Sequence, residues 1–310
     1  MPVEILQTQK LLPTCEQALA ERYTVHKLHE AADRDELLAR VGKSVRGVAC
    51  GVADAALIER LPNLEIIAHF GVGYDSVDTD AAKARGIAVT NTPDVLTNAV
   101  AELTIGLMLA LSRRIVVADR YVRDGKWRSP NTFPFAHELN GKTVGILGLG
   151  RIGKEVAARA QAMRMRVVYH GRRRQPDEPH IYYDNLVDMA RDSDWLVIIA
   201  PGGKETAGIV NRTVLEALGP EGYLLNIARG SLVDEPALVE MLRENKLAGA
   251  ALDVFVNEPS VPEDLLKLDN VVLTPHIGSA SSQTRDKMGQ MLVDNLDAHF
   301  AGKPLLSRVI

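Results

Sequence analysis

The stretch Val144–Gly153, "VGILGLGRIG", decides the fold, because an apolar run ends in the pattern G-x-G-x-x-G and a helical segment, Lys154–Met163, follows. In that setting Gly148 permits a tight turn, Gly150 lets the backbone approach a pyrophosphate, and Gly153 lets helix and strand pack closely. The N–H groups and positive dipole end of the helix attract phosphates. A tight turn without a ligand is the alternative, but strand, helix and a second strand together favour a nucleotide. The contacts expected from this turn are Gly148, Gly150, Arg151, Ile152 and Gly153.

The second strand of this unit, Arg166–Tyr169, is followed by three consecutive arginines in the stretch "YHGRRRQ". The residue that ends this strand is usually an acid when it binds the ribose hydroxyls of NAD. Here His170 occupies that place, Gly171 opens the turn, and Arg172–Arg174 supply cationic donors suited to a phosphate dianion. We therefore predict NADP(H) as the cofactor, although a solvated run of surface charge would look the same. The expected contacts are Gly171, Arg172 and Arg173.

Short apolar runs alternate with amphipathic stretches along the whole chain, which is the pattern of parallel sheets covered by helices. The strands predicted in a first region are Val3–Leu6, Val45–Cys50, Glu65–His69 and Ile87–Thr90. Those predicted in a second region are Thr143–Gly148, Arg166–Tyr169, Trp195–Ala200, Tyr223–Ile227, Gly249–Leu252 and Val271–Thr274. The sequence thus predicts an α/β protein with two doubly wound parallel-sheet domains, both Rossmann-like.

Two helical segments bear on how the domains are divided. Asn98–Ile115 is apolar over most of its circumference and must be covered on several sides. Ser282–Phe300 is amphipathic, follows the last strand, and could run back to the first region. We therefore predict a discontinuous, flavodoxin-like substrate-binding domain, 1–97 plus 285–310, and a dinucleotide-binding domain, 98–284.

Composition excludes several classes of protein. The chain has 310 residues, 46% of them hydrophobic, and a net charge of −4, so its basic residues form no footprint for nucleic acid. Cys15 and Cys50 have no metal-ligand spacing, so we expect no metal site and no disulfide framework. The N-terminal stretch lacks a secretory apolar run, and no later run approaches membrane-spanning length. We expect a cytosolic protein without membrane or nucleic-acid partners.

Polar residues follow three strands of the second region. Arg229 comes just after one strand, Asp253 ends the next with Glu258 five residues on, and His276 follows the last. Open α/β sheets bind ligands at the carboxyl ends of their strands. Singly, each residue has an ordinary structural explanation. Jointly they supply a cation for a carboxylate, an acid–base group, and a carboxylate to tune it.

At these residues the chain resembles the NAD(P)-dependent D-2-hydroxyacid dehydrogenase family over nearly its whole length. The stretches that carry the resemblance are "GVGYDSVD" (71–78), "TNAVAE" (97–102), "GLGRIG", "NIARGSLVDEPAL" (226–238), "GAALDVFVNEP" (249–259) and "TPHIGSAS" (274–281). The chain looks most like the glyoxylate/hydroxypyruvate reductases and hydroxyphenylpyruvate reductases. One departure is "APGGKETAGIV" (200–210), where Gly202 and Gly203 replace a common Leu-Thr-Pro run and put that loop's cofactor contacts in doubt.

The resemblance implies a set of roles. Arg229, Glu258 and His276 would be catalytic, with Arg229 and His276 also contacting the substrate; Asp253 would bind the nicotinamide carboxamide. The backbone of Val72 and Gly73 would hold the substrate carboxylate.

These roles predict NADPH-dependent reduction of a small 2-oxo acid, glyoxylate or hydroxypyruvate, to the D-2-hydroxy acid. His276 would protonate the developing alkoxide, Glu258 would favour its imidazolium form, and Arg229 would polarise the carbonyl. Two alternatives stay open: a hydroxyphenylpyruvate reductase, and a dinucleotide-sensing corepressor of the same fold. The sequence does not choose among the oxo acids, because they differ only in a side chain met by an unseen pocket wall.

The apolar helix Asn98–Ile115 also predicts self-association, since one stripe buried within a monomer would leave further apolar surface in water. The resemblance points the same way, because family members pair through this helix and the segment after it, here Tyr121–His137. We predict a two-fold symmetric homodimer with a large apolar interface.

Overall fold

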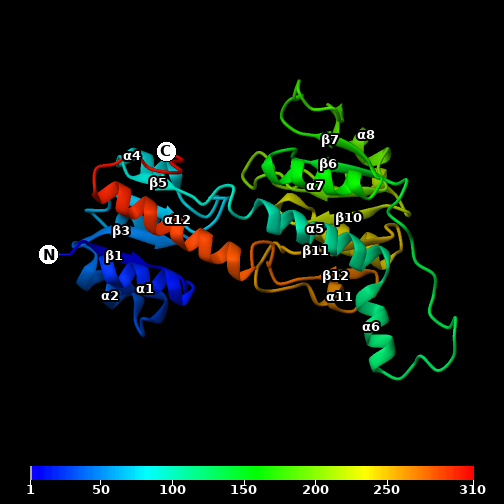
Figure 1. Ribbon diagram of the computed structural model, residues 1–310, viewed down its shortest axis with the longest axis horizontal. Coiled ribbons are helices and arrows are strands. Elements are labelled where there is room, and N and C mark those ends of the chain that lie inside the picture. The colour runs from blue at the N-terminus through cyan, green and yellow to red at the C-terminus, as the bar shows by residue number, and fades with distance from the viewer. Residues whose placement is uncertain (1) are drawn as a thin grey trace. The chain divides into compact units, whose positions relative to one another are not determined.

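A computed structural model describes residues 2–310 and divides into two compact units. The first consists of the chain up to Leu96 together with Ala280–Ile310, and the second is Thr97–Ser279. Each unit contains one sheet whose neighbouring strands are all parallel (Figure 1). This confirms the predicted fold class of two doubly wound α/β domains.

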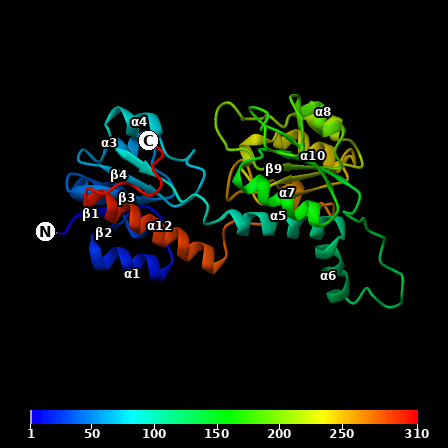
Figure 2. The same cartoon turned by 45° about the horizontal axis from the view of Figure 1, so that its top comes forward.

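The first unit has a five-stranded sheet in the order β2-β1-β3-β4-β5, which is the flavodoxin-like order. Its strands are β1 (Glu4–Gln7), β2 (Thr24–Lys27), β3 (Val45–Cys50), β4 (Ile66–His69) and β5 (Ala88–Thr90). Its helices are α1 (Pro13–Arg22), the 3-10 helix η1 (Leu28–Glu30), α2 (Arg34–Val41), α3 (Ala55–Glu59), α4 (Thr79–Ala84) and α12 (Ser282–Phe300). Helices α1 and α12 cover one face of the sheet, and α3 and α4 cover the other (Figure 2).

The second unit has a seven-stranded sheet in the order β12-β11-β10-β9-β6-β7-β8, with the Rossmann reversal between β6 and β9. Its strands are β6 (Thr143–Leu147), β7 (Arg166–His170), β8 (Ile181–Tyr183), β9 (Trp195–Ile198), β10 (Tyr223–Asn226), β11 (Gly249–Leu252) and β12 (Val271–Leu273). Its helices are α5 (Thr97–Ser112), α6 (Ile115–Arg123), α7 (Arg151–Ala162), α8 (Leu186–Arg191), α9 (Arg212–Leu218), the 3-10 helix η2 (Gly230–Leu232), α10 (Glu235–Arg243) and α11 (Glu263–Leu266). Helices α5 and α7 pack together, and α8, α9 and α10 share a separate apolar core with the sheet.

The structure corrects the predicted elements in two ways. The edge strands β2 and β8 were not predicted, because "TVHK" and "IYY" are short and lack the buried alternation of a central strand. The helix expected at Asn98–Ile115 ends earlier, because α5 stops at Ser112 and a second helix, α6, begins at Ile115. Arg114 between them has a left-handed backbone with φ +53°, which ends one helical path and begins another.

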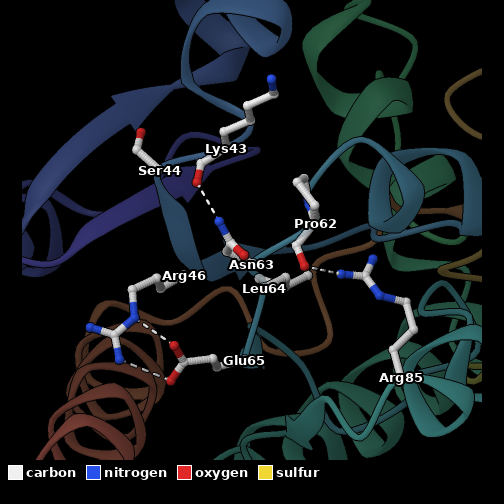
Figure 3. A pocket seen from close by; sticks show the side chains of 8 residues that line it. All are labelled: Lys43, Ser44, Arg46, Pro62, Asn63, Leu64, Glu65 and Arg85. Atoms are coloured by element: carbon white, nitrogen blue, oxygen red, sulfur yellow. Dashed lines mark hydrogen bonds and ion pairs between the residues drawn. The ribbon is translucent and has the colours of Figure 1, made fainter.

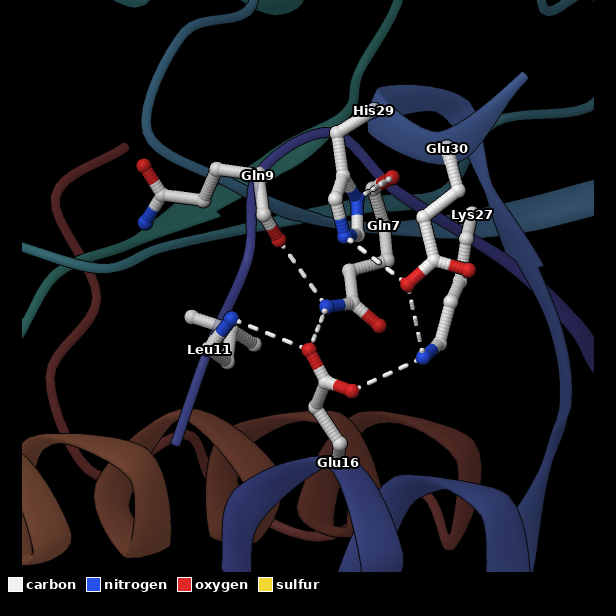
Figure 4. Close-up of polar contacts among 7 residues, drawn as sticks. All are labelled: Gln7, Gln9, Leu11, Glu16, Lys27, His29 and Glu30. Atoms are coloured by element: carbon white, nitrogen blue, oxygen red, sulfur yellow. Dashed lines mark hydrogen bonds and ion pairs between the residues drawn. The ribbon is translucent and has the colours of Figure 1, made fainter. Parts of the chain in front are cut away.

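A polar cluster closes the carboxyl end of β1 around the carboxylate of Glu16 (Figure 4). Gln7, which is fully buried, donates its side-chain amide to Glu16 Oε1 at 2.9 Å, and the Leu11 N–H donates to the same oxygen at 3.1 Å. Lys27 Nζ donates to Glu16 Oε2 at 2.8 Å. Burial opposes ionisation of Glu16, but these three donors outweigh it and lower its pKa to about 2.

A pocket of about 580 Å³ lies at the opposite edge of the same sheet, before β3 and β4 (Figure 3). Its two arginines are already engaged: Arg46 forms two hydrogen bonds with Glu65, and Arg85 donates to the backbone carbonyls of Ile58, Leu61 and Pro62. Parallel sheets bind ligands at the carboxyl ends of their strands. This pocket lies at the amino ends, so we do not place the functional site here.

Both cysteines are free and buried, and burial raises the pKa of Cys15 to about 11 and that of Cys50 to about 12. Neither thiol is therefore a ready nucleophile at neutral pH. Within residues 2–310, no helix combines the length and apolar character needed to cross a membrane.

Candidate active site

The glycine-rich turn between β6 and α7 has the geometry of a phosphate cradle. Gly148 has a left-handed backbone with φ +101°, and a Cβ there would lie 2.7 Å from the backbone nitrogen of Ala200. A Cβ on Gly153 would collide with the carbonyl oxygen of Gly148. A Cβ on Gly150 would meet no atom within 4 Å. Two glycines are thus required by packing, whereas Gly150 borders open space that a Cβ would partly fill.

Helix α7 presents its amino end to this open space. Gly150 is its N-cap and supplies no side-chain hydrogen bond to the first turn, in contrast to Asp33, which caps α2 through two backbone N–H groups. The N–H groups and positive dipole end of a twelve-residue helix are therefore not satisfied by a capping side chain. The turn fits the pyrophosphate of a dinucleotide.

The turn after β7 carries the three arginines, and their side chains are exposed. Within residues 2–310, Arg172, Arg173 and Arg174 form no hydrogen bond or ion pair with the protein, so their charge is available to a ligand. His170 ends the strand as predicted, and its Nδ1 lies 2.9 Å from the carbonyl oxygen of Tyr183 on β8. A hollow of about 350 Å³ lies beside this turn and is lined by Lys154, Arg173, Arg174, Gln175, Pro176, Asp177 and Glu178.

The predicted catalytic residues follow three adjacent strands of the second sheet, β10, β11 and β12, at their carboxyl ends. Arg229 is half-buried, and the residue after it, Gly230, packs so closely on the Phe255 backbone that a Cβ there would collide with it. This contact requires glycine and brings the Arg229 turn against the segment that leads to Glu258.

The structure brings His276 and Glu258 into direct contact. His276 Nδ1 lies 2.7 Å from Glu258 Oε2, and the other carboxylate oxygen accepts a hydrogen bond of 3.0 Å from the Phe255 N–H. The imidazole remains partly exposed, with 45% of its side-chain surface accessible. His276 also has a left-handed backbone with φ +52°, a conformation that costs energy for a residue with a side chain and is concentrated at functional sites.

Asp253 holds the loop that carries His276. Its carboxylate accepts hydrogen bonds from Thr274 Oγ1 at 2.7 Å and from the N–H groups of Ile277 and Gly278, both at 2.8 Å. The side chain is 1% exposed, and the His276 N–H donates to the Asp253 carbonyl oxygen at 2.9 Å. The observed role of Asp253 is therefore to fix residues 274–278, and its contact with a nicotinamide carboxamide stays a prediction.

In the first unit, the loop that follows β4 has three consecutive carbonyls held by the protein. Gly71 O accepts from the Thr92 N–H at 2.8 Å, and Val72 O accepts from the Asn91 side-chain amide at 2.9 Å. Gly73 O lies 2.9 Å from Nε2 of the buried His69. Since a carbonyl oxygen can only accept, that nitrogen carries the proton. These contacts fix the backbone of residues 71–73, and successive backbone N–H groups held in a fixed conformation can bind an anion.

Several contributors to the site were not found from the sequence. Lys154, Gln175 and Glu178 line the hollow beside the arginines, and His69 supports the loop 71–73. Their only sequence signal is closeness to a motif, because each acts through a tertiary contact. The departure at Gly203 has a backbone reason: its φ of +146° is rarely adopted by residues with a side chain.

A family model described as "D-isomer specific 2-hydroxyacid dehydrogenase, NAD binding domain" matches residues 105–278. The chain belongs to the D-isomer-specific 2-hydroxyacid dehydrogenase family. This confirms the resemblance of the sequence motifs, and it makes the protein an oxidoreductase whose second unit is that family's dinucleotide-binding domain.

Relatives of this 2-hydroxyacid dehydrogenase cover nearly the whole chain. A glyoxylate/hydroxypyruvate reductase A of Arabidopsis thaliana and a hydroxyphenylpyruvate reductase of Plectranthus scutellarioides are each 48% identical to it over 298 residues, which is 95% of both chains. Among solved structures, the NADPH-dependent glyoxylate/hydroxypyruvate reductase of Sinorhizobium meliloti, in complex with NADP and malonate, has a TM-score of 0.95 and 44% identity. That match covers 100% of this chain and 97% of the other.

Proposed function

We propose that this dehydrogenase uses NADPH to reduce a small 2-oxo acid, glyoxylate or hydroxypyruvate, to the D-2-hydroxy acid. The observation that carries the proposal is the His276–Glu258 pair at the carboxyl edge of the sheet, with Arg229 after the neighbouring strand. The relatives and the solved structure that share this family and nearly the whole chain support the same substrate class.

The geometry of the pair supports His276 as the proton donor. When bound, NADPH supplies a hydride to the carbonyl carbon of the oxo acid, and the carbonyl oxygen then needs a proton. Because Nδ1 of His276 faces Glu258, Nε2 is the nitrogen left to donate that proton. Glu258 keeps the Nδ1–H in place while the ring changes from imidazolium to neutral imidazole. In the reverse direction the neutral Nε2 accepts the hydroxyl proton of the D-hydroxy acid.

Two groups bind the substrate carboxylate in this proposal. The Arg229 guanidinium pairs with it and stabilises the negative charge that develops on the carbonyl oxygen. The N–H groups of Val72 and Gly73 also bind the carboxylate, which is the role that fits a loop whose carbonyls are anchored.

In this proposal the arginine turn gives the enzyme its preference for NADPH over NADH. Gly148, Gly150, Arg151, Ile152 and Gly153 hold the pyrophosphate. The 2′-phosphate of NADPH binds at Gly171, Arg172 and Arg173. The two arginine side chains are exposed to solvent, and no acidic residue ends the preceding strand. Asp253 contacts the nicotinamide carboxamide in addition to holding its loop.

A second candidate substrate is hydroxyphenylpyruvate, because a hydroxyphenylpyruvate reductase is as similar to this chain as the glyoxylate/hydroxypyruvate reductase is. A panel of glyoxylate, hydroxypyruvate and hydroxyphenylpyruvate, each with NADPH and with NADH, separates the candidates by kcat/KM. We expect NADPH with one of the two small acids to give the highest value. If NADPH supports the reduction of none of the three acids, the proposal is overturned.

We further propose that the protein is a cytosolic homodimer, with α6 and the segment after it in the interface. Within one chain α5 is largely covered, whereas α6 has no buried residue. Large apolar side chains in this region are exposed: Ile115, Val116, Val122, Trp127 and Phe135. Phe135 is 98% exposed, and such surface favours association. Light scattering coupled to size exclusion should give about twice the chain mass of 33.8 kDa, and active protein at the single-chain mass would contradict the dimer.

A further inference from the structure

The arginine turn is tied directly to the glycine-rich turn by one side chain, Gln175. Its Nε2 donates a hydrogen bond of 2.6 Å to the carbonyl oxygen of Leu149, between the first two glycines of the motif. The Gln175 backbone N–H also donates to the hydroxyl of Tyr169 at 2.8 Å, and Tyr169 is a buried residue of β7. Gln175 therefore anchors the far end of the turn to two fixed parts of the fold.

Further contacts close the same segment. The Tyr182 hydroxyl donates to the carbonyl oxygen of Gly171 at 3.2 Å, which holds the near end of the turn. Beyond Gln175, Glu178 forms an ion pair with Lys154 on α7, with 2.5 Å between Oε1 and Nζ. The three arginines thus project from a short segment that is fixed at both ends, beside the hollow that Arg173 and Arg174 line.

We propose that Gln175 is a positioning residue for cofactor specificity: it holds the arginine turn at a set distance from the glycine-rich turn, so that the 2′-phosphate and pyrophosphate sites form one cradle. This inference rests on the proposed use of NADPH. Without the tether, the arginines would have to be ordered when the cofactor binds, and that ordering would weaken binding. NADH does not use the arginines, so its binding should lose little.

The test is Gln175→Met, which keeps the length of the side chain and removes its hydrogen-bond donor. Equilibrium dissociation constants for NADPH and NADH are measured on the full chain by fluorescence, and hydrogen exchange of residues 169–178 is measured without cofactor. We expect the Kd for NADPH to rise about 3–10-fold, as for one lost neutral hydrogen bond, while the Kd for NADH changes less than about 2-fold. Exchange should become faster in the turn. Gln17→Met is the matched control, because it removes a side-chain amide bond on α1.

A double-mutant cycle separates positioning from direct contact. If Gln175 acts through the arginines, Gln175→Met should add less than about 2-fold to the NADPH Kd once Arg172 and Arg173 are alanine. An additive effect would mean that Gln175 contacts the phosphate itself. Equal weakening of NADPH and NADH binding would mean that Gln175 only supports the glycine-rich turn. Either result overturns the inference. A wild-type protein without preference for NADPH would overturn the proposed cofactor as well. A ratio of the NADPH and NADH Kd values that Gln175→Met leaves unchanged overturns the inference alone.

Discussion

Glu16 gives the sharpest prediction about stability, because its pKa is lowered from the ordinary value of 4.5 to about 2. Each pH unit corresponds to about 1.4 kcal/mol, so the ionised carboxylate stabilises the first unit by about 3 kcal/mol relative to its protonated form. The side chain is 20% exposed, so solvent screening removes little of this. Glu16→Gln resembles the protonated form and should lower the free energy of unfolding by about 3 kcal/mol at pH 7.

The pH dependence has a definite sign. A carboxylate whose pKa is lower in the folded state stabilises fully above its unfolded pKa, and it loses that contribution as the pH falls through the folded value. The difference between wild type and Glu16→Gln should therefore be constant above about pH 5 and fall to roughly 1.4 kcal/mol at pH 3. Urea unfolding followed by circular dichroism measures it, and hydrogen exchange of β1 reports the first unit specifically.

Glu30→Gln is the matched control. Glu30 accepts a hydrogen bond from the same Lys27, but its side chain is 58% exposed, so its loss should change stability by less than about 1 kcal/mol. If Glu16→Gln costs no more than Glu30→Gln, or costs as much at pH 3 as at pH 7, the reasoning from the polar cluster is refuted.

Three further predictions concern function. Replacing Arg172 and Arg173 by alanine should weaken NADPH binding by about 1.5–3 kcal/mol for each lost charge-assisted hydrogen bond and leave NADH binding nearly unchanged. Equal weakening of the two cofactors would show that the arginines are only solvated surface charge. His276→Asn should lower kcat at least about 100-fold with little change in the NADPH Kd, whereas near-native turnover of this variant would refute His276 as the proton donor. His69→Ala should raise KM for the oxo acid roughly 3–10-fold with kcat unchanged and with partial rescue by His69→Gln, whereas an unchanged KM would contradict its support of the loop 71–73.

The central strands could be predicted because burial on both faces makes them apolar runs, as in β9 and β11. The edge strands β2 and β8 are defined by pairing with one neighbour rather than by composition, so the pattern of the chain does not reveal them. The predicted end of helix α5 was wrong for a related reason. Apolar residues continue past Arg114, and only the left-handed backbone there shows that the continuing residues belong to a different helix.

The candidate site divides in the same way. Arg229, Asp253 and His276 could be found because each follows an apolar strand, and parallel strands bring their carboxyl ends to one edge. The contact between Glu258 and His276, 18 positions apart in the chain, was expected from the family resemblance, whereas the contact between Gln175 and Leu149, 26 positions apart, was not expected. Such pairs depend on how loops fold over the sheet, which periodicity and motif spacing do not specify.

The order of the strands also separates cofactor choice from chemistry. The arginine turn follows β7, whereas the residues proposed to act on the substrate follow β10, β11 and β12. Strands lie roughly 4.8 Å apart, so β7 and β10 are about 14 Å apart across the sheet, and β7 and β12 about 24 Å. Sites at such distances without shared partners contribute additively. The losses from the arginine pair and from His276→Asn should therefore add in free energy. A dinucleotide that reaches both ends of this edge must cross the glycine-rich turn after β6, so Gln175, which joins that turn to the arginines, can alter the choice of cofactor without touching the proton donor.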